Sequence, residues 1–283
     1  MVICQPAVAS RLKGLLQNYM VASLSMSDSA HTHASSTAYR VGTRTCAVVI
    51  PFYNEVEGTP AFLEELAGVL QFQDRVVEVL LVDDGSTDGT TAVLEGAAQA
   101  HAGWRVVRQP ANQGQAAALY RGMRLASAQV VVTLDGDGQN DPSDIATLIA
   151  RLDESGADMV AGVRVDRNDS WLRKRMSRIA NRVRQWLLRD GVTDTGCGLK
   201  AFRREVVEAF LPMRTLYSFM PALAVAGGFT VVEQPVRHRA RQLGQSKYGL
   251  GVMLWRPLLD LLGVWWFSRR RFAAQAESGG PRS

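Results

Sequence analysis

Short apolar runs alternate with helical patterns along the first half of the ordered chain, and this alternation limits the fold more than any other feature. Apolar runs rich in β-branched residues occur at positions 46–50, 76–82 and 130–134, and 104–108 looks like a further strand, with helical patterns at 60–70, 87–100 and 114–126 between them. Strands that alternate with helices predict βαβ units. We therefore expect an α/β fold with a mainly parallel, Rossmann-like sheet.

The composition fits an ordinary globular chain and excludes few functions. The 283 residues are 47% hydrophobic and 21% charged, which is enough to bury a core and excludes bulk disorder. A net charge of +5 leaves nucleic acid, acidic lipid and phosphorylated small molecules open as partners. The three cysteines lie far apart without a Cys-x-x-Cys pair, which favours a reducing, cytoplasmic compartment over a disulfide framework.

Three predicted strands end in polar clusters, at residues 51–55, 83–86 and 135–139. The carboxyl ends of parallel strands open onto one crevice, where ligands bind in such sheets. Asp135 and Asp137 can converge there on a hard cation, Mg²⁺ or Mn²⁺, which would bridge the diphosphate of a nucleotide. Gln139 would add a neutral oxygen. The alternative is a solvated turn, because Asp-Gly pairs are common in turns.

Basic residues crowd positions 164–189, where the acidic residues are Asp166 and Asp169. Arginine forks suit bidentate binding of phosphate, so we expect a phosphate group near this stretch. A solvated helix face is the alternative for any one of them. A nucleic-acid groove is disfavoured, because no aromatic residues are interleaved beyond Trp171 and Trp186 and no known nucleic-acid motif occurs. The basic residues are Arg164, Arg167, Arg173, Lys174, Arg175, Arg178, Arg182, Arg184 and Arg189.

The polar clusters, taken in order, resemble glycosyltransferase family 2 across residues 46–247. The motifs that carry the resemblance are Pro51-x-Tyr53-Asn54-Glu55, Asp83-Asp84-Gly85-Ser86-x-Asp88, Asn112-x-Gly114 and Asp135-x-Asp137-x-Gln139. Later motifs are similar to the branch that makes polyprenyl-phosphate sugars, such as dolichyl-phosphate mannose synthase and its bacterial relatives. These are Gly162-x-Arg164, Arg173-x-x-x-Ser177-Arg178, Asp194-x-x-Cys197-Gly198 and Ser246-Lys247-Tyr248.

The resemblance implies a GT-A catalytic domain over residues 45–250, a UDP- or GDP-linked sugar donor, inversion at the anomeric carbon and transfer to polyprenyl (undecaprenyl) phosphate. It also implies the roles of the site residues. The donor-binding residues would be Pro51, Tyr53, Asn54, Glu55, Asp83, Asp84, Gly114, Asp135 and Lys247. The metal ligands would be Asp137 and Gln139. The acceptor phosphate would meet Arg164, Arg173, Ser177 and Arg178, and the catalytic residues would be Asp135, Arg164, Arg173 and Ser177.

A phosphate acceptor explains the absence of an evident general base, because a lipid phosphate is already ionised at neutral pH. The product would supply lipid-linked sugar for cell-envelope glycan or lipid A modification. Two other functions stay open: a family 2 transferase that acts on a saccharide hydroxyl, and a non-catalytic binding protein tethered to a membrane.

The two ends of the chain predict further segments. Residues 1–44 are expected to be a disordered extension, since positions 27–37 are rich in Ser, Ala, His and Thr without periodicity. Residues 251–272 are expected to form an amphipathic membrane-interface segment, and 273–283 a disordered tail. The tryptophans of the former and Arg269–Arg271 suit the headgroup region, whereas Arg256, Pro257 and Asp260 disfavour a bilayer span.

This segment predicts a peripheral enzyme on the cytoplasmic face of the inner membrane, with separate transmembrane subunits or a flippase as partners. Packing of the segment on the domain core, or on such a subunit, is the alternative.

Overall fold

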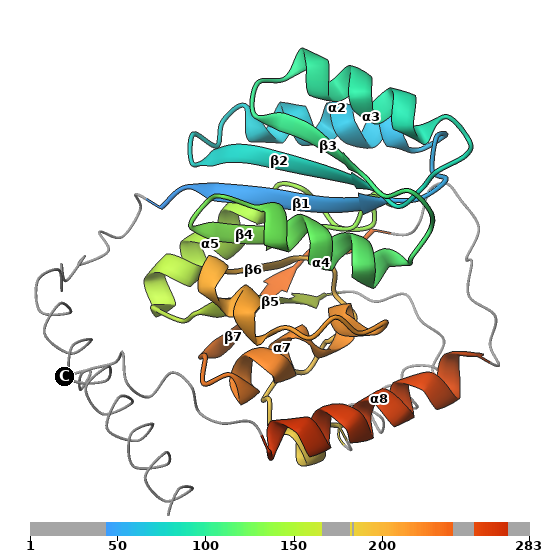
Figure 1. Cartoon of the computed structure of the whole chain (residues 1–283). Coiled ribbons are helices and arrows are strands. Elements are labelled where there is room, and N and C mark those ends of the chain that lie inside the picture. Colours follow the sequence, from blue (N-terminus) through green and yellow to red (C-terminus); the bar gives the residue numbers. More distant parts are fainter. Residues whose placement is uncertain (1–43, 166–181, 183, 240–251, 271–283) are drawn as a thin grey trace, which may run out of the picture. The chain divides into compact units, whose positions relative to one another are not determined.

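The structure is a computed structural model that describes residues 44–165, 182, 184–239 and 252–270, with side chains of the last helix from residue 259 onward (Figure 1). The predicted disordered tail, and the predicted extension up to residue 43, lie outside these ranges. Arg44, the last residue of that predicted extension, is buried and forms an ion pair of 2.6 Å with Asp153.

A mixed, mainly parallel sheet forms the centre of the described chain. Its order is β3-β2-β1-β4-β6-β5-β7. The strands β3, β2, β1 and β4 are parallel, β6 is antiparallel to both of its neighbours, and β7 is parallel to β5. The predicted Rossmann-like sheet is therefore confirmed, with one reversed strand. The strands are β1 Cys46–Phe52, β2 Val76–Asp83, β3 Trp104–Arg108, β4 Val130–Thr133, β5 Met159–Arg164, β6 Lys200–Arg203 and β7 Val231–Val236.

Helices cover both faces of the sheet (Figure 1). One face packs against α2, α3 and α5, and the other packs against α4, α7 and the 3-10 helix η1. A proline in the first turn of α2, where the backbone N–H has no helical partner, fits the start of that helix. The helices are α2 Thr59–Leu70, α3 Thr90–Ala100, α4 Gln115–Leu125, α5 Asp144–Ser155, η1 Arg204–Ala209, α7 Leu216–Ala226 and α8 Val252–Ser268.

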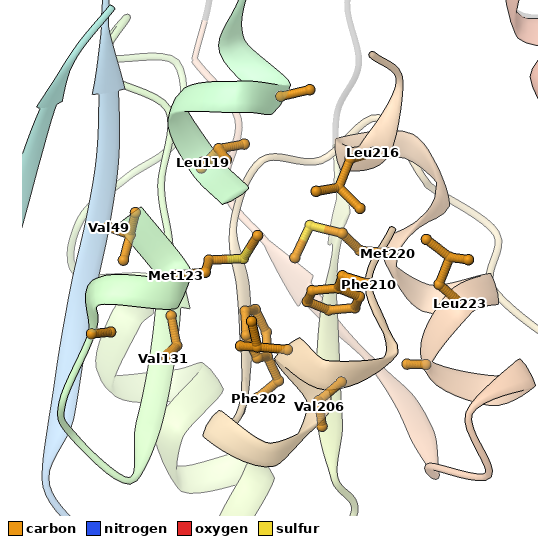
Figure 2. Packing of buried hydrophobic residues seen from close by; sticks show 14 of the residues in the cluster. Val49, Leu119, Met123, Val131, Phe202, Val206, Phe210, Leu216, Met220 and Leu223 are labelled. Carbon is orange, nitrogen blue, oxygen red and sulfur yellow. The ribbon is translucent and has the colours of Figure 1, made fainter. Parts of the chain in front are cut away.

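Strand β1 is buried along its whole length, and its side chains divide between the two cores. Val48 and Ile50 join the cluster under α2 and α5, whereas Val49 joins the cluster under α4. This division follows from the alternation of side chains along a strand. Figure 2 shows Val49 beside Met123 of α4, and the same cluster continues through Phe202 and Phe210. The core thus holds the carboxyl ends of the central strands in fixed positions.

Helix α4 approaches the sheet closely at Gly122. A Cβ at this position would lie 2.4 Å from Val49 Cγ1 and 2.9 Å from Val82 Cγ2. Gly122→Ala is therefore expected to lower the free energy of unfolding by about 1–3 kcal/mol, because it overpacks the core. Gly96→Ala is the matched control in α3, where a Cβ meets nothing within 4 Å. Urea denaturation should show the control equal to or more stable than the wild type; equal loss in both variants would contradict this packing.

The last helix, α8, packs on α7 through one face. Leu261 and Val264 are buried there, and Thr215 Oγ1 donates a hydrogen bond of 2.6 Å to Asp260. The opposite face exposes large apolar side chains, and Arg269 lies over the Trp265 ring at 4.6 Å. Those exposed side chains are Leu259, Leu262 and Trp266. None of the helices that the structure describes is both long and apolar enough to cross a bilayer.

Candidate functional site

The loops that follow β1 and β2 are joined to one another at the carboxyl edge of the sheet. The Asp84 N–H donates to the Phe52 carbonyl at 2.9 Å. Asn54 has a positive φ of 49°, and its N–H donates to Ser86 Oγ at 3.1 Å. The Glu55 N–H donates to Thr90 Oγ1 at 3.0 Å. The structure thus brings the predicted donor-binding residues of both loops together, with Pro51 paired to Val82 in the adjoining strands.

Asp83 and Asp84 are buried, and their carboxylates accept hydrogen bonds from other residues of the protein. Asp83 accepts hydrogen bonds from the Ser86 N–H and from Thr91 Oγ1, which fixes the turn into α3. Asp84 accepts from Gln109 Nε2 and from the backbone N–H groups of the β3–α4 loop. Burial raises the pKa of Asp84, and the N–H donors act against that shift. Their direct contact with a donor molecule stays a prediction.

Gly114 connects Asp84 to the start of α4. Its N–H donates to Asp84 Oδ2 at 2.8 Å, and its φ of 95° lies in the region that favours glycine. The next residue, Gln115, donates from Nε2 to Asp135 Oδ1 at 2.8 Å. The β2 and β4 loops are therefore linked through the beginning of α4. Sequence reasoning missed Gln115, because a glutamine at a helix start carries no signal of its own.

Asp135 lies just past β4, and its carboxylate is electrostatically perturbed. Burial, and then the nearby charge of Asp137, raise the pKa of Asp135 to about 6, whereas Lys200 and the Gln115 hydrogen bond act in the opposite direction. Asp137 Oδ1 accepts the Gln139 N–H at 3.1 Å, which closes the loop between the two predicted metal ligands. The negative charges of Asp135 and Asp137 repel each other, so a cation bound near them would stabilise the ionised forms of both.

The residues in this loop fit a divalent cation of the kind that nucleotide-sugar chemistry uses. Asp137 and Gln139 offer hard oxygen atoms, and Mg²⁺ characteristically combines one or two carboxylates with phosphate oxygens of a substrate. Within the described ranges, no group of three or more Asp, Glu, His or Cys side chains could hold a metal ion by itself. A site completed by a diphosphate is therefore the arrangement that these residues suit.

Asp135→Asn is expected to stabilise the metal-free protein at neutral pH. The pKa of Asp135 is about 6 in the folded protein against 3.8 for an ordinary aspartate, so its ionised form opposes folding above pH 6. The variant should be more stable at pH 7.5 by roughly 3 kcal/mol, because one unit of pKa shift corresponds to about 1.4 kcal/mol and the new amide oxygen can still accept the hydrogen bond from Gln115. Urea denaturation in EDTA measures this difference.

The pH dependence provides the internal control for that comparison. The stability difference should shrink as the pH falls from 6 towards 4, because the wild-type carboxyl then takes up its proton in the folded state. A difference that stays constant across this range would show that the charge of Asp135 is not its cause.

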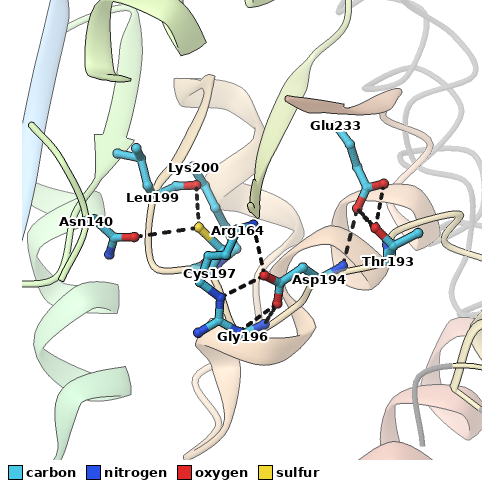
Figure 3. Close-up of polar contacts among 9 residues, drawn as sticks. All are labelled: Asn140, Arg164, Thr193, Asp194, Gly196, Cys197, Leu199, Lys200 and Glu233. Carbon is cyan, nitrogen blue, oxygen red and sulfur yellow. Dashed lines mark hydrogen bonds and ion pairs between the residues drawn. The ribbon is translucent and has the colours of Figure 1, made fainter. Parts of the chain in front are cut away.

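Arg164, at the end of β5, is held by a buried carboxylate. Its Nε and Nη2 donate to the two oxygens of Asp194 at 2.7 and 2.8 Å, and Figure 3 shows this fork. The Gly196 N–H donates to Asp194 Oδ1 at 3.1 Å. The pKa of Arg164 is raised, because the Asp194 hydrogen bonds and charge outweigh the opposing effect of burial. The guanidinium is thus fixed in place, and its charge acts on Asp135 across the loop.

The chain after β7 lies beside the predicted metal loop. The Arg239 N–H donates to the Gln139 carbonyl at 2.8 Å, and its guanidinium contacts Glu65 and Asp141 at 2.7 and 2.8 Å. These contacts were not predicted, because they join segments far apart in the sequence. The remaining predicted site residues lie outside the described residues: Arg173, Ser177, Arg178 and Lys247.

The model of the family described as "Glycosyl transferase family 2" matches residues 47–211, which is more than half of the chain and includes every motif placed above. The chain belongs to this family. The recognition made from the sequence motifs is therefore confirmed, and so is the glycosyltransferase-type fold expected from it.

Relatives within and around the family differ in how much of the chain they share. An undecaprenyl-phosphate 4-deoxy-4-formamido-L-arabinose transferase from Enterobacter sp. (strain 638) is 39% identical over 71% of this chain, and the chain spans 62% of that relative's length. Glucosyl-3-phosphoglycerate synthase from Mycobacterium tuberculosis, solved with Mn²⁺, UDP and phosphoglyceric acid, has a TM-score of 0.62 at 21% identity over 78% of each chain. A mannosyltransferase from Pyrobaculum calidifontis, solved with GDP-Man and Mn²⁺, has a TM-score of 0.53 at 23% identity, over 74% of this chain and 59% of that one.

Proposed function

We propose that this family 2 protein is an inverting glycosyltransferase that moves a sugar from a UDP- or GDP-linked donor to a polyprenyl phosphate. The observation that carries the proposal is the placement of the Arg164–Asp194 fork in electrostatic reach of Asp135, next to the predicted metal loop. Asp194 takes the Nε and one Nη2 hydrogen of Arg164 and fixes the guanidinium, whose remaining N–H groups can bind a phosphate oxygen, whereas a sugar hydroxyl does not need them. The undecaprenyl-phosphate relative at 39% identity supports the same acceptor class.

The donor would lie along the carboxyl edge of β1, β2 and β4. Asp137 and Gln139 would hold Mg²⁺ or Mn²⁺, and a bound ion would offset the charge that develops on the departing diphosphate. Asp135, kept in place by Gln115, would orient the donor sugar and ribose. The β1 and β2 loops, joined through Asn54 and Ser86, would enclose the nucleotide.

The acceptor phosphate would enter from the side of Arg164. Its oxygen attacks the anomeric carbon opposite the diphosphate, so the new C–O bond forms as the bond to the diphosphate breaks, and the configuration inverts. Arg164 would position the phosphate and reduce the repulsion between two anions. Because the attacking oxygen is already ionised, the step needs no proton acceptor.

A second candidate acceptor is a saccharide hydroxyl, and the position of Asp135 favours it. Asp135 is a buried carboxylate at the donor side, held by Gln115, and a carboxylate in that position is the kind of group that can accept a hydroxyl proton. The product separates the two candidates. Transfer to phosphate gives a lipid-linked sugar that mild acid releases, whereas transfer to a hydroxyl gives an acid-resistant glycoside and a rate that depends on Asp135 ionisation.

The enzyme would act at a membrane surface, on the cytoplasmic face of the inner membrane. The exposed face of α8 carries Leu262 and Trp266, with Arg270 lying over the Trp266 ring at 5.0 Å. Apolar side chains beside tryptophan and arginine suit the boundary of an anionic bilayer. Separate transmembrane subunits or a flippase would then receive the product for cell-envelope glycan or lipid A modification.

Leu262→Glu combined with Trp266→Glu is expected to weaken binding to vesicles that contain phosphatidylglycerol by about tenfold or more. Each of these side chains contributes about 1.5–3 kcal/mol when it leaves water, and the new carboxylates repel the anionic surface. Co-sedimentation with vesicles measures the effect. Phe72→Glu is the matched control, since Phe72 is also an exposed apolar side chain but follows α2. Equal binding by both variants would exclude α8 as the membrane contact.

The test of the proposed reaction is the mass and the acid lability of the lipid product. Purified protein, undecaprenyl phosphate in detergent, Mn²⁺ and a panel of UDP- and GDP-sugars should yield one acid-labile lipid monophosphate sugar. An acid-resistant product, or a diphosphate linkage, would contradict the proposal.

A further inference from the structure

One short turn touches the acceptor side and the donor side of the site at once. It consists of Gly196, Cys197 and Gly198, and we call it the glycine turn. A Cβ on Gly196 would lie 2.7 Å from Arg164 Nη2, and a Cβ on Gly198 would lie 2.0 Å from Asp135 Oδ2. Both approaches require the absence of a side chain. The turn lies between Arg164 and Asp135, and because its two glycines carry no side chain, its backbone sets the distance between them.

Two side-chain hydrogen bonds hold the glycine turn. Thr133 Oγ1, at the end of β4, donates to the Gly198 carbonyl at 2.8 Å. Lys200 Nζ, at the start of β6, donates to the Cys197 carbonyl. Figure 3 shows Lys200 close to Cys197 and to the Arg164–Asp194 fork. The turn is thus fixed from two neighbouring strands that pair Thr133 with Lys200.

Lys200 is an unusual residue to find at this place. Its side chain is 1% exposed, and burying an ammonium group is costly without strong compensation. The carboxylates of Asp135 and Asp194 favour its charge, and Arg164 opposes it. Its ammonium group donates to the Cys197 carbonyl and compensates the charges of Asp135 and Asp194, so one side chain connects the turn to both sides of the site.

We infer that Lys200 is a positioning residue, which fixes the glycine turn and with it the spacing between the acceptor fork at Arg164 and the donor side at Asp135. The inference rests on the proposed function, because the spacing matters only if both substrates meet there. Reaction geometry is sensitive to such spacing, and a misplacement of about 1 Å lowers turnover by about 100-fold.

Lys200→Met tests this role, because methionine keeps much of the length and removes the charge and the donor. Loss of the ammonium group leaves the buried Asp135 and Asp194 carboxylates less compensated, so the melting temperature should fall, and activity and exchange are compared at a temperature where the variant is fully folded. Its kcat for transfer to undecaprenyl phosphate should fall by about 100-fold, with both KM values nearly unchanged. Amide hydrogen exchange of the peptide that spans residues 194–200 should become faster. Unchanged exchange, or faster exchange with unchanged kcat, would overturn the inference.

Arg203→Met is the matched control on the same strand. Arg203 pairs with Asp158 at 3.2 Å, away from the glycine turn, so removal of its charge should leave kcat and the exchange of residues 194–200 as in the wild type. A fall in kcat equal to that of Lys200→Met would contradict a local role. If the wild type makes no lipid-linked sugar while Lys200→Met still speeds exchange, the proposed function fails and the holding of the turn by Lys200 stands.

Thr133→Val gives a second, independent route to the same turn. It removes the other hydrogen bond and keeps the shape of the β4 side chain. Because both residues act through one turn, the double variant with Lys200→Met should lose less kcat than the product of the two single losses. Losses that multiply fully would show that the two residues act independently and would overturn the shared role.

Discussion

Asp137→Asn is expected to lower sugar transfer by about 100- to 1000-fold while the protein stays folded. Asparagine keeps an oxygen that can accept the Gln139 N–H, but it removes the charge that a divalent cation and a departing diphosphate require. Stability should stay equal or rise, because Asp137 is one cause of the raised pKa of Asp135. Steady-state transfer at saturating Mn²⁺, together with urea denaturation, measures both effects.

Asp74→Asn is the charge-matched control for this experiment. Asp74 is exposed and lies before β2, at the opposite end of that strand from the site. Its replacement should leave transfer and the Mn²⁺ requirement unchanged. Nearly normal transfer by Asp137→Asn at the same Mn²⁺ concentration would exclude Asp137 as a metal ligand.

The second large effect is expected at the Arg164–Asp194 pair. Substitutions there should change stability and transfer activity independently of each other. Arg164→Met leaves the buried Asp194 carboxylate without its cation, and the free energy of unfolding should fall by about 3–5 kcal/mol. Adding Asp194→Asn removes that charge and keeps an acceptor for the Gly196 N–H, so most of the stability should return. Transfer to lipid phosphate should stay at least about 100-fold below the wild type in both variants.

The matched control is the neighbouring buried pair of Arg184 and Asp190, whose side chains contact each other at 2.6 Å. Arg184→Met should cost comparable stability, and adding Asp190→Asn should restore both stability and most of the transfer activity. The readouts are urea denaturation and the initial rate of lipid glycosylation. Recovery of transfer in the Arg164/Asp194 double variant would mean that the arginine is only structural.

The carboxyl edge of the sheet could be predicted from the sequence because it depends on local patterns. The strand patterns located β1, β2, β3 and β4, and the polar clusters that follow β1, β2 and β4 marked one edge. Parallel pairing then placed Asp83 and Asp135 on that edge without further information.

The inner side of the site could not be predicted, because it depends on pairings between distant segments. Strand β6 enters antiparallel between β4 and β5, and this insertion brings Lys200 against the turn before it. The sequence marked Arg164 as a phosphate ligand but gave no sign that Asp194 takes two of its nitrogen atoms. Burial of a lysine also has no local signature, since lysine is ordinarily exposed.

The most direct test of the central claim is whether release of the nucleoside diphosphate depends on lipid phosphate. Purified protein is incubated with Mn²⁺ and a panel of UDP- and GDP-sugars, with and without undecaprenyl phosphate. We predict release from one donor that requires both the metal and the lipid phosphate, and that Asp137→Asn and Arg164→Met abolish. Release that is indifferent to lipid phosphate but rises with a saccharide acceptor would contradict the account.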